Sequence, residues 1–219
     1  MKLSIITINL NNKQGLERTI NSVLSQTFFD KIDYIIIDGG STDGSKELIE
    51  QHKDKLYYWC SELDKGIYNA MNKGIAASTS DYLLFLNSGD YLKENNVLER
   101  TFPYLEYDFV YGNEWKVNER NKSPYEAKYP DKLDESFFRR TSLPHQSTFI
   151  RAELLKESHY SEDYKIISDW KFFIEAFRSG KTYKHMPFIV SVYDCNGFSY
   201  QNLNLMQQEK FEYYKKVTT

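Results

Sequence analysis

Four short apolar runs within residues 1–90 constrain the fold of this chain most strongly. Each run is almost continuous instead of alternating with polar residues, which is typical of strands buried on both faces of a parallel sheet. Segments with apolar residues at helical spacing separate the runs, so we expect an α/β fold with a doubly wound, mostly parallel sheet and helices on both faces. The four runs are residues 3–8, 34–37, 56–59 and 82–86.

A cluster of polar residues and glycines follows each run, at the point where the strand should end. These clusters are residues 7–9, 38–41, 61–64 and 87–90. The carboxyl ends of parallel strands meet at one edge of a sheet, and ligands of doubly wound folds bind beyond that edge. The sequence therefore predicts that the four clusters form one binding site.

The rest of the chain has a less regular pattern, and we expect one domain over residues 1–200. The stretches 108–111 and 114–117 predict a hairpin that turns at Gly112 and Asn113. Residues 118–136 contain Pro124 and Pro130 and predict a loop or mobile flap. The other expected elements are a strand around 149–150, a helix over 169–177, a strand over 188–193 and a small C-terminal helical extension within 201–219.

The composition excludes several classes of function. Lys and Arg number 28 against 31 Asp and Glu, so the net charge is −3 and binding to nucleic acid is not expected. Cys60 and Cys195 lie far apart, which excludes a zinc site of two Cys-x-x-Cys pairs. No segment approaches the roughly 18–20 apolar residues of a membrane span. The first apolar run is too short for a signal peptide, so we expect a cytoplasmic protein.

Four residues could carry chemistry, and each also has a structural interpretation. Asp38 could accept hydrogen bonds from a nucleobase or a ribose, or could cap the next helix. Asp90, on a tight turn, suits Mg²⁺ or Mn²⁺, or simply closes that turn. His145 could contact phosphate, metal or acceptor, although a lone histidine is more often structural. Asp169 could be a general base or could cap an aromatic helix.

Four ordered stretches together resemble the family 2 inverting glycosyltransferases, whose fold is called GT-A. The stretches are residues 3–9, 37–44, 64–74 and 85–90. His145-Gln146 and the segment 168–170 are similar to later features of that family. The closest resemblance is to the branch that assembles bacterial polysaccharides, such as capsule, exopolysaccharide or lipopolysaccharide side chains.

The resemblance implies a role for each matching residue. Asp169 would be the catalytic base, and Asp90 would hold Mn²⁺ or Mg²⁺. Asn87 and Gly89 replace other positions of the family's Asp-x-Asp motif, so the donor diphosphate would supply further metal ligands. The residues implied to bind the nucleotide sugar are Thr7, Asn9, Asp38, Gly40, Asp64, Lys65, Asn72, Asn87, Ser88 and His145.

The implied function is a metal-dependent, inverting transfer of a sugar from a nucleotide sugar, with UDP-sugar as the first expectation. The acceptor would be a hydroxyl of a growing surface polysaccharide or lipid-linked glycan. Residues 1–90 would bind the nucleotide and 91–200 the acceptor, with 118–136 as a lid. The extension could touch the inner face of a bacterial plasma membrane, or pack on the domain or a second copy of the chain. The alternatives are a nucleotidyltransferase that makes nucleotide sugars and a non-enzymatic nucleotide-binding module.

Overall fold

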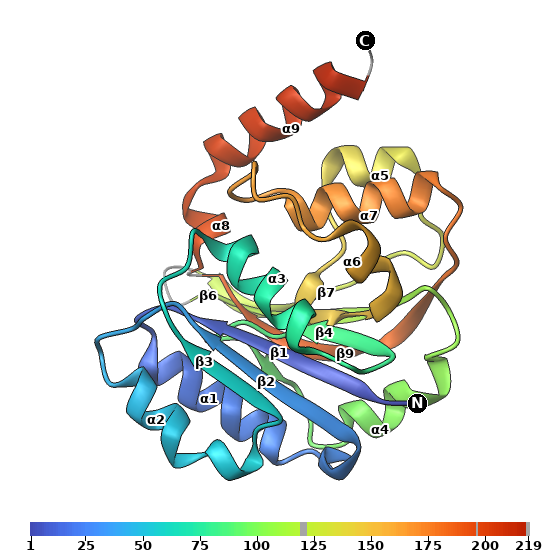
Figure 1. The fold of residues 1–219 in the computed structure, drawn as a ribbon. Helices are drawn as coiled ribbons and strands as arrows, with labels where there is room; N and C mark the ends of the chain where they lie inside the picture. The colour runs from blue at the N-terminus through green and yellow to red at the C-terminus, as the bar shows by residue number, and fades with distance from the viewer. Residues whose placement is uncertain (119–121, 196, 218–219) are drawn as a thin grey trace.

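One mixed sheet runs through the molecule with helices on both faces (Figure 1). The computed structural model describes residues 1–118, 122–195 and 197–217. Within these residues the strand order is β3-β2-β1-β4-β8-β6-β9-β5, and β7 pairs with β6 outside this path. The strands are β1 (Leu3–Asn9), β2 (Ile32–Asp38), β3 (Tyr58–Ser61), β4 (Tyr82–Phe85), β5 (Tyr91–Leu92), β6 (Phe109–Asn118), β7 (Lys122–Ala127), β8 (Thr148–Arg151) and β9 (Tyr183–Asp194).

The first four strands are parallel to one another, as the apolar runs predict. Alternate residues of each strand supply two separate cores: Ile5 packs with the layer of α1 and α2, whereas Ile6 packs with the layer of α3, α6 and α7. Figure 1 shows these two helical layers below and above the sheet. The helices are α1 (Lys13–Leu24), α2 (Ser45–Gln51), α3 (Ile67–Ala77), α4 (Val97–Thr101), α5 (Glu135–Arg140), α6 (Ala152–Ser158), α7 (Ser168–Arg178), α8 (Phe198–Gln201) and α9 (Leu203–Val217). Short 3-10 helices lie at η1 (Phe29–Lys31), η2 (Lys53–Lys55), η3 (Phe102–Tyr104) and η4 (His145–Ser147).

The second half of the sheet is mixed rather than parallel. β8 runs antiparallel to both β4 and β6, β9 runs parallel to β6, and β5 runs antiparallel to β9. The α/β prediction is confirmed, and the parallel arrangement holds for the first four strands. The sheet is continuous across residue 90, so residues 1–90 and the rest of the predicted domain share one framework.

The predicted hairpin around Gly112 and Asn113 is wrong, because both residues lie inside the continuous strand β6. The glycine serves close packing instead of a turn. A Cβ at Gly112 would lie 2.5 Å from Cγ2 of Val190 and 2.9 Å from the carbonyl oxygen of Phe188. The register between β6 and β9 also shifts on either side of Asn113. A close approach to an irregular neighbouring strand is a second common role of glycine in strands.

The predicted loop over 118–136 is also partly wrong. It contains β7, which pairs antiparallel with β6, and the first residues of α5. Residues 119–121, near the beginning of the expected lid, lie outside the described residues. The edge position of β7 explains how a strand can contain Pro124, because an edge strand need not donate from every backbone nitrogen.

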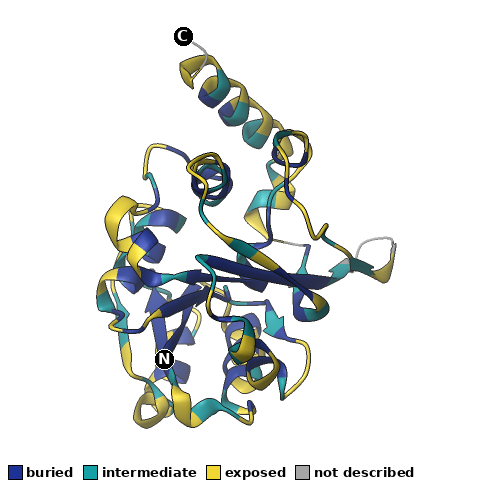
Figure 2. Ribbon diagram, turned by 90° about the vertical axis from the view of Figure 1, so that its right-hand side faces the viewer, coloured by how far each residue is buried: buried dark blue, intermediate teal, exposed yellow. Residues whose placement is uncertain are grey.

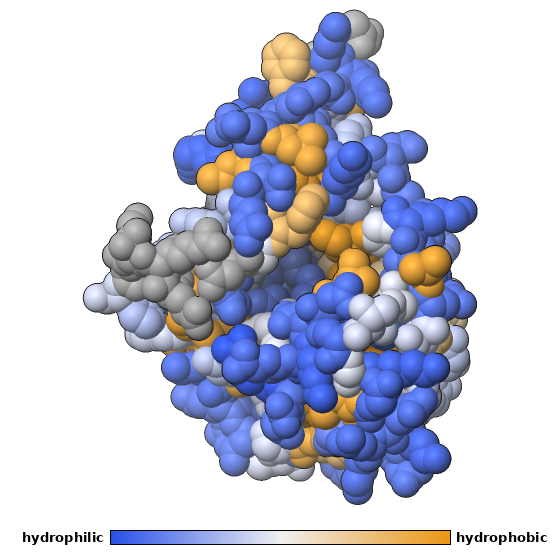
Figure 3. All heavy atoms as spheres, turned by 90° about the vertical axis from the view of Figure 1, so that its left-hand side faces the viewer, coloured by the Kyte–Doolittle hydropathy of each residue, from blue (hydrophilic) through white to orange (hydrophobic). Residues whose placement is uncertain are grey.

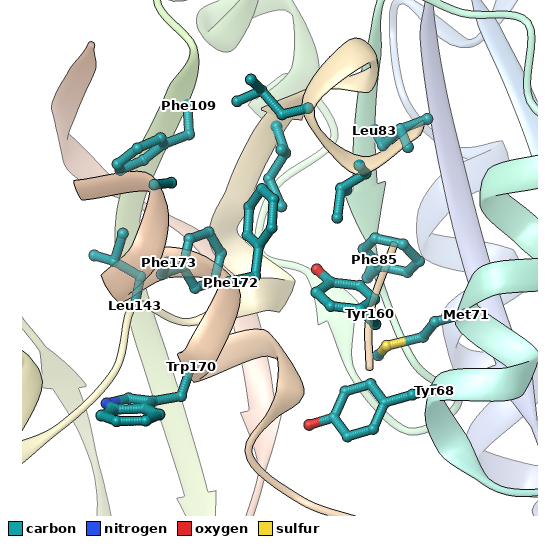
Figure 4. Packing of buried hydrophobic residues seen from close by; sticks show 14 of the residues in the cluster. Tyr68, Met71, Leu83, Phe85, Phe109, Leu143, Tyr160, Trp170, Phe172 and Phe173 are labelled. Atoms are coloured by element: carbon teal, nitrogen blue, oxygen red, sulfur yellow. The ribbon is translucent and has the colours of Figure 1, made fainter. Parts of the chain in front are cut away.

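An aromatic core joins α7 to the sheet and to α3. Figure 4 shows Tyr68 of α3 and Phe85 of β4 facing the side chains of α7. The ring of Tyr160 lies 5.5 Å from that of Phe85 and 5.8 Å from that of Phe172. Buried residues concentrate in the strands and on the inward helix faces (Figure 2). This packing fixes the start of α7 relative to the carboxyl ends of the parallel strands.

The expected C-terminal helical extension is present as α8 and α9. The inner face of α9 is anchored by Glu209, which accepts hydrogen bonds from the backbone N–H groups of Lys165 (2.7 Å) and Ile166 (3.1 Å). Tyr213 is buried, and its ring lies 5.1 Å from that of Trp170. Within the described residues, no helix has both the length and the apolar character needed to cross a bilayer.

Candidate active site

A cleft of about 750 Å³ opens beyond the carboxyl ends of the parallel strands. All four polar clusters contribute to it, through Asn9, Gly39, Asp64 and the turn 87–90. His145 and Asp169 line the same cleft from the second half of the chain. Figure 3 shows a hollow on the corresponding face of the molecule. The strand ends therefore converge on one cleft, as the sequence predicts.

Asp169 lies in the first turn of α7 and is held by several hydrogen bonds. Its Oδ2 lies 2.9 Å from Nδ1 of His145, and its Oδ1 accepts from the hydroxyl of Tyr68 at 2.9 Å and from the backbone N–H of Trp170 at 2.8 Å. Burial raises the pKa of Asp169, but these hydrogen bonds and the charge of His145 outweigh burial and hold the pKa below its usual value. Asp169 is therefore an oriented carboxylate at neutral pH.

His145 connects Asp169 to the turn that follows β4. Its Nδ1 faces Asp169, and its Nε2 lies 3.1 Å from Nδ2 of Asn87. When His145 is neutral, an amide N–H of Asn87 that donates to Nε2 leaves the ring proton on Nδ1, directed at Asp169. Burial lowers the pKa of His145, but Asp169, with the charges of Asp90 and Glu114, outweighs burial and raises it.

Asp90 is a buried carboxylate whose charge receives little stabilisation from the hydrogen bonds and charges of the chain. It is 5% exposed and lines the cleft. The backbone N–H of Asp194 donates to its Oδ1 at 3.0 Å. Burial raises the pKa of Asp90 to about 7, because this hydrogen bond and the charge of His145 do not offset burial, and Glu114 and Asp194 add like charge.

Asp38 lies beneath the cleft instead of lining it. Its carboxylate accepts from Nδ2 of Asn9 (2.8 Å), from the backbone N–H (3.0 Å) and hydroxyl (2.5 Å) of Ser41, and from the hydroxyl of Ser61 (2.7 Å). Burial raises the pKa of Asp38, but these donors outweigh burial and lower it. In this structure Asp38 joins the ends of β1, β2 and β3.

The other predicted residues divide into two groups. Asp64, Lys65, Asn87 and Ser88 line the cleft with Asn9, and Asp64 pairs with Lys73 at 2.6 Å. Thr7, Gly40 and Asn72 are not among its lining residues. Thr7 is bonded to the hydroxyl of Tyr34 at 3.1 Å, Gly40 has a φ of +78°, and Asn72 donates to the carbonyl of Tyr160 at 2.8 Å.

Sequence reasoning gave no role to several residues that the fold brings to the cleft. Tyr68, Arg18, Tyr193 and Asp194 line it, and Arg18 pairs with Asp194 at 3.5 Å. Tyr68 stands inside a stretch that resembles the family, which is the only signal that could have marked it. Glu114 does not line this cleft but is almost fully buried near Asp90 and His145, and no pattern in the sequence marks it.

The donor set at Asp90 fits a divalent cation that is shared with a substrate. Among the described residues, no cluster of three or more His, Cys, Asp or Glu side chains could hold a metal alone. The buried and under-compensated carboxylate of Asp90 still provides the negative charge that a cation requires. Mg²⁺ commonly binds through one or two carboxylates with the rest of its ligands from phosphates and water.

Sequence comparison places the chain among known glycosyltransferases. The family model described as glycosyl transferase family 2 matches residues 4–168. An uncharacterised glycosyltransferase of Mycobacterium tuberculosis is 32% identical over 182 residues, which covers 80% of this chain and 68% of that protein. A glycosyltransferase of PGL/p-HBAD biosynthesis from Mycobacterium bovis is 29% identical over 202 residues, which covers 87% of this chain and 76% of that protein.

Solved structures with a similar fold belong to glycosyltransferases. Residues 1–349 of Staphylococcus aureus TarS, in complex with UDP-GlcNAc, match with a TM-score of 0.73 and 19% identity, over 89% of this chain and 58% of that one. A mannosyltransferase of Pyrobaculum calidifontis, in complex with GDP-Man and Mn²⁺, matches with a TM-score of 0.69 and 14% identity, over 88% and 56%. The chain thus spans a little more than half of these two structures. The chain belongs to glycosyl transferase family 2 and has the GT-A fold.

Proposed function

We propose that this chain transfers a sugar from a UDP-sugar to an acceptor hydroxyl with inversion at the anomeric carbon. One observation carries the proposal: Asp169 and Asp90 line the same cleft, where His145 contacts Asp169 and its charge acts on Asp90. A single bound nucleotide sugar can therefore face both carboxylates. The complexes of UDP-GlcNAc with TarS and of GDP-Man with the Pyrobaculum enzyme support this class of donor.

Asp169 is the proposed general base. Its lowered pKa keeps it ionised at neutral pH, and the bonds to Tyr68 and His145 fix its orientation. Its carboxylate takes the proton of the acceptor hydroxyl while that oxygen attacks the anomeric carbon. The bond to the diphosphate breaks on the opposite face, so one displacement inverts the configuration. A positioned base of this kind contributes about 10²–10⁴-fold to the rate.

Asp90 is the proposed protein ligand of Mn²⁺ or Mg²⁺, with the donor diphosphate completing the site. When bound, the cation stabilises the charge that develops on the leaving nucleoside diphosphate. Asn9, Asp64, Lys65 and Ser88 lie where they can contact the donor. Asp38, Thr7, Gly40 and Asn72 do not line the cleft in the present structure, so their proposed role in donor binding is indirect.

The proposed acceptor is a growing surface polysaccharide or a lipid-linked glycan, reached at the inner face of a bacterial plasma membrane. A nucleotidyltransferase would need a glycine-rich basic loop after the first strand. Residues 10–15 instead lead into α1, where Asn12 caps the helix by accepting from the backbone N–H of Gly15 at 3.1 Å.

Binding of nucleotide sugars followed by turnover tests this proposal. We expect one or more UDP-sugars to raise the melting temperature of the full chain with Mn²⁺ present. The best binder should then release UDP in the presence of an acceptor, with an inverted product by NMR. Retention of configuration, or release of pyrophosphate from a nucleoside triphosphate, would contradict it.

A further inference from the structure

A second cavity of about 390 Å³ adjoins the cleft at the Asp169–His145 pair. Both cavities are lined by Asp169, His145 and Tyr193, so the two spaces meet at the proposed base. An inverting displacement needs the attacking hydroxyl on the side of the base and the leaving group on the opposite side. The second cavity therefore has the position that an acceptor requires.

The charge of this second cavity differs from that of the whole chain. The net charge of the chain is −3, yet Lys116, Arg139, Arg140 and Lys210 all line the cavity. Its acidic residues, Asp169 and Glu114, already have partners in the structure. Glu114 accepts from the hydroxyl of Tyr129 at 2.5 Å and pairs with Lys116 at 3.4 Å.

Three of these cations have no carboxylate within ion-pair distance in the ranges that the structure describes. Lys210 lies over the ring of Trp170, with its Nζ 4.7 Å from the ring centre. Arg139 lies over the ring of Tyr214, 5.2 Å from its centre, and Arg140 donates to the hydroxyl of Ser136. Aromatic rings and a hydroxyl orient the cations without neutralising them, which leaves their charge available to a ligand.

The position of Lys210 is fixed by the fold. The adjacent Glu209 is buried and bonded to the backbone just before α7, and Tyr213 packs on Trp170. Burial lowers the pKa of Lys210 to about 8, and the charge of Asp169 only partly opposes this effect. A partly buried ammonium group of this kind gains from an anion placed beside it.

We propose that the second cavity binds the acceptor and is built for an acceptor that carries a phosphate group close to the attacking hydroxyl. Lys210 and Arg139 would contact that phosphate. The assignment of this cavity to an acceptor rests on the proposed glycosyl transfer. A polyprenyl diphosphate and a phosphodiester-linked polymer both offer this chemistry.

Calorimetric titration of the full chain, saturated with UDP and Mn²⁺ to fill the larger cleft, tests the proposal. The probes are geranyl diphosphate with geraniol as its neutral partner, and glycerophosphoglycerol with diglycerol as its neutral partner. We expect at least one anionic probe to bind more tightly than its neutral partner. The tighter anionic probe then indicates whether the phosphate comes from a lipid diphosphate or a phosphodiester.

Variants make this test specific for the cavity. Lys210→Met and Arg139→Gln should each weaken the anionic probe by about tenfold, as expected for one charge-assisted contact, without changing UDP binding. Lys156→Met, on the exposed face of α6, should have no effect. Equal binding of charged and neutral probes, or binding that neither variant weakens, would overturn the inference. The titration is repeated without UDP, so a failure to bind UDP counts against the proposed function alone.

Discussion

The buried carboxylates of Asp38 and Asp90 have pKa values shifted in opposite directions. At the end of β2, Asp38 accepts hydrogen bonds from Asn9, Ser41 and Ser61, which lower its pKa. On the turn after β4, Asp90 accepts from the backbone of Asp194, and burial raises its pKa to about 7. The chain stabilises the charge of Asp38 with its own donors and leaves that of Asp90 under-compensated.

The difference distinguishes the structural carboxylate of Asp38, beneath the cleft, from the carboxylate of Asp90, which lines it. Donors around Asp38 come from the ends of three adjacent parallel strands, so its charge helps to hold these ends together. Asp90 lies on the turn after β4 and lines the cleft, as Asp169 does from the start of α7. A carboxylate that the protein leaves under-compensated in a cleft is a candidate for binding a ligand.

The largest expected effect concerns Asp169. We expect Asp169→Asn to lower turnover by about 10²–10⁴-fold, because an amide cannot take the proton of the acceptor. UDP affinity should stay within about threefold of the native value, because the general base acts on the acceptor in the transition state. Initial-rate measurements and calorimetry with UDP check this pair of results. Asp54→Asn, an exposed position on η2, is the matched control, and near-normal turnover of Asp169→Asn would remove the base assignment.

A smaller effect is expected at Asp90. In the native chain Mn²⁺ should tighten UDP binding, and Asp90→Asn should reduce that gain by at least about tenfold. The same variant should melt at a higher temperature than the native chain in EDTA at pH 8, because it removes a buried, under-compensated charge. Calorimetry and thermal melting measure the two effects. A UDP affinity that Mn²⁺ does not change in either protein would refute the metal site.

The fold of the first half could be read from the sequence because its strands are buried on both faces. Such strands are continuous apolar runs, and their order along the chain gives the parallel arrangement. The second half could not be read in the same way. Gly112 has the sequence signature of a turn but serves the close approach of β9, and Pro124 lies in an edge strand. Both roles depend on neighbours that are distant in the chain.

Site residues were likewise predictable only where local sequence, and not distant contacts, determines their position. Residues that follow a strand, such as Asn9, Asp64 and Asp90, could be placed at the cleft because the strand ends meet there. Tyr68 could not, since its hydroxyl reaches Asp169 across 101 residues of sequence. Whether a carboxylate is satisfied by the protein also depends on tertiary contacts, so Asp38 and Asp90 look equivalent in the sequence.

The smallest expected effect is at Asp38, and it tests whether this carboxylate has the structural role that distinguishes it from Asp90. Asp38→Asn places an amide N–H among groups that donate to the carboxylate, which should cost about 2 kcal/mol and lower the melting temperature by about 4–8 °C at pH 7. The folded-state pKa of Asp38 is lowered, so its stabilisation is present above the ordinary carboxyl pKa of about 4 and is lost as the pH falls. The difference in melting temperature should therefore shrink between pH 7 and pH 3.

Thermal melts of the variant, the native chain and the exposed control Asp30→Asn across this pH range measure the effect. Because Asp38 lies behind the cleft wall, the response of UDP binding to Mn²⁺ should survive in the variant, unlike in Asp90→Asn. An unchanged melting temperature together with weaker UDP binding would give Asp38 the direct nucleotide contact that the family resemblance implies. In that case the two carboxylates would both be ligand-binding groups, and the distinction between the structural carboxylate of Asp38 and that of Asp90 would be wrong.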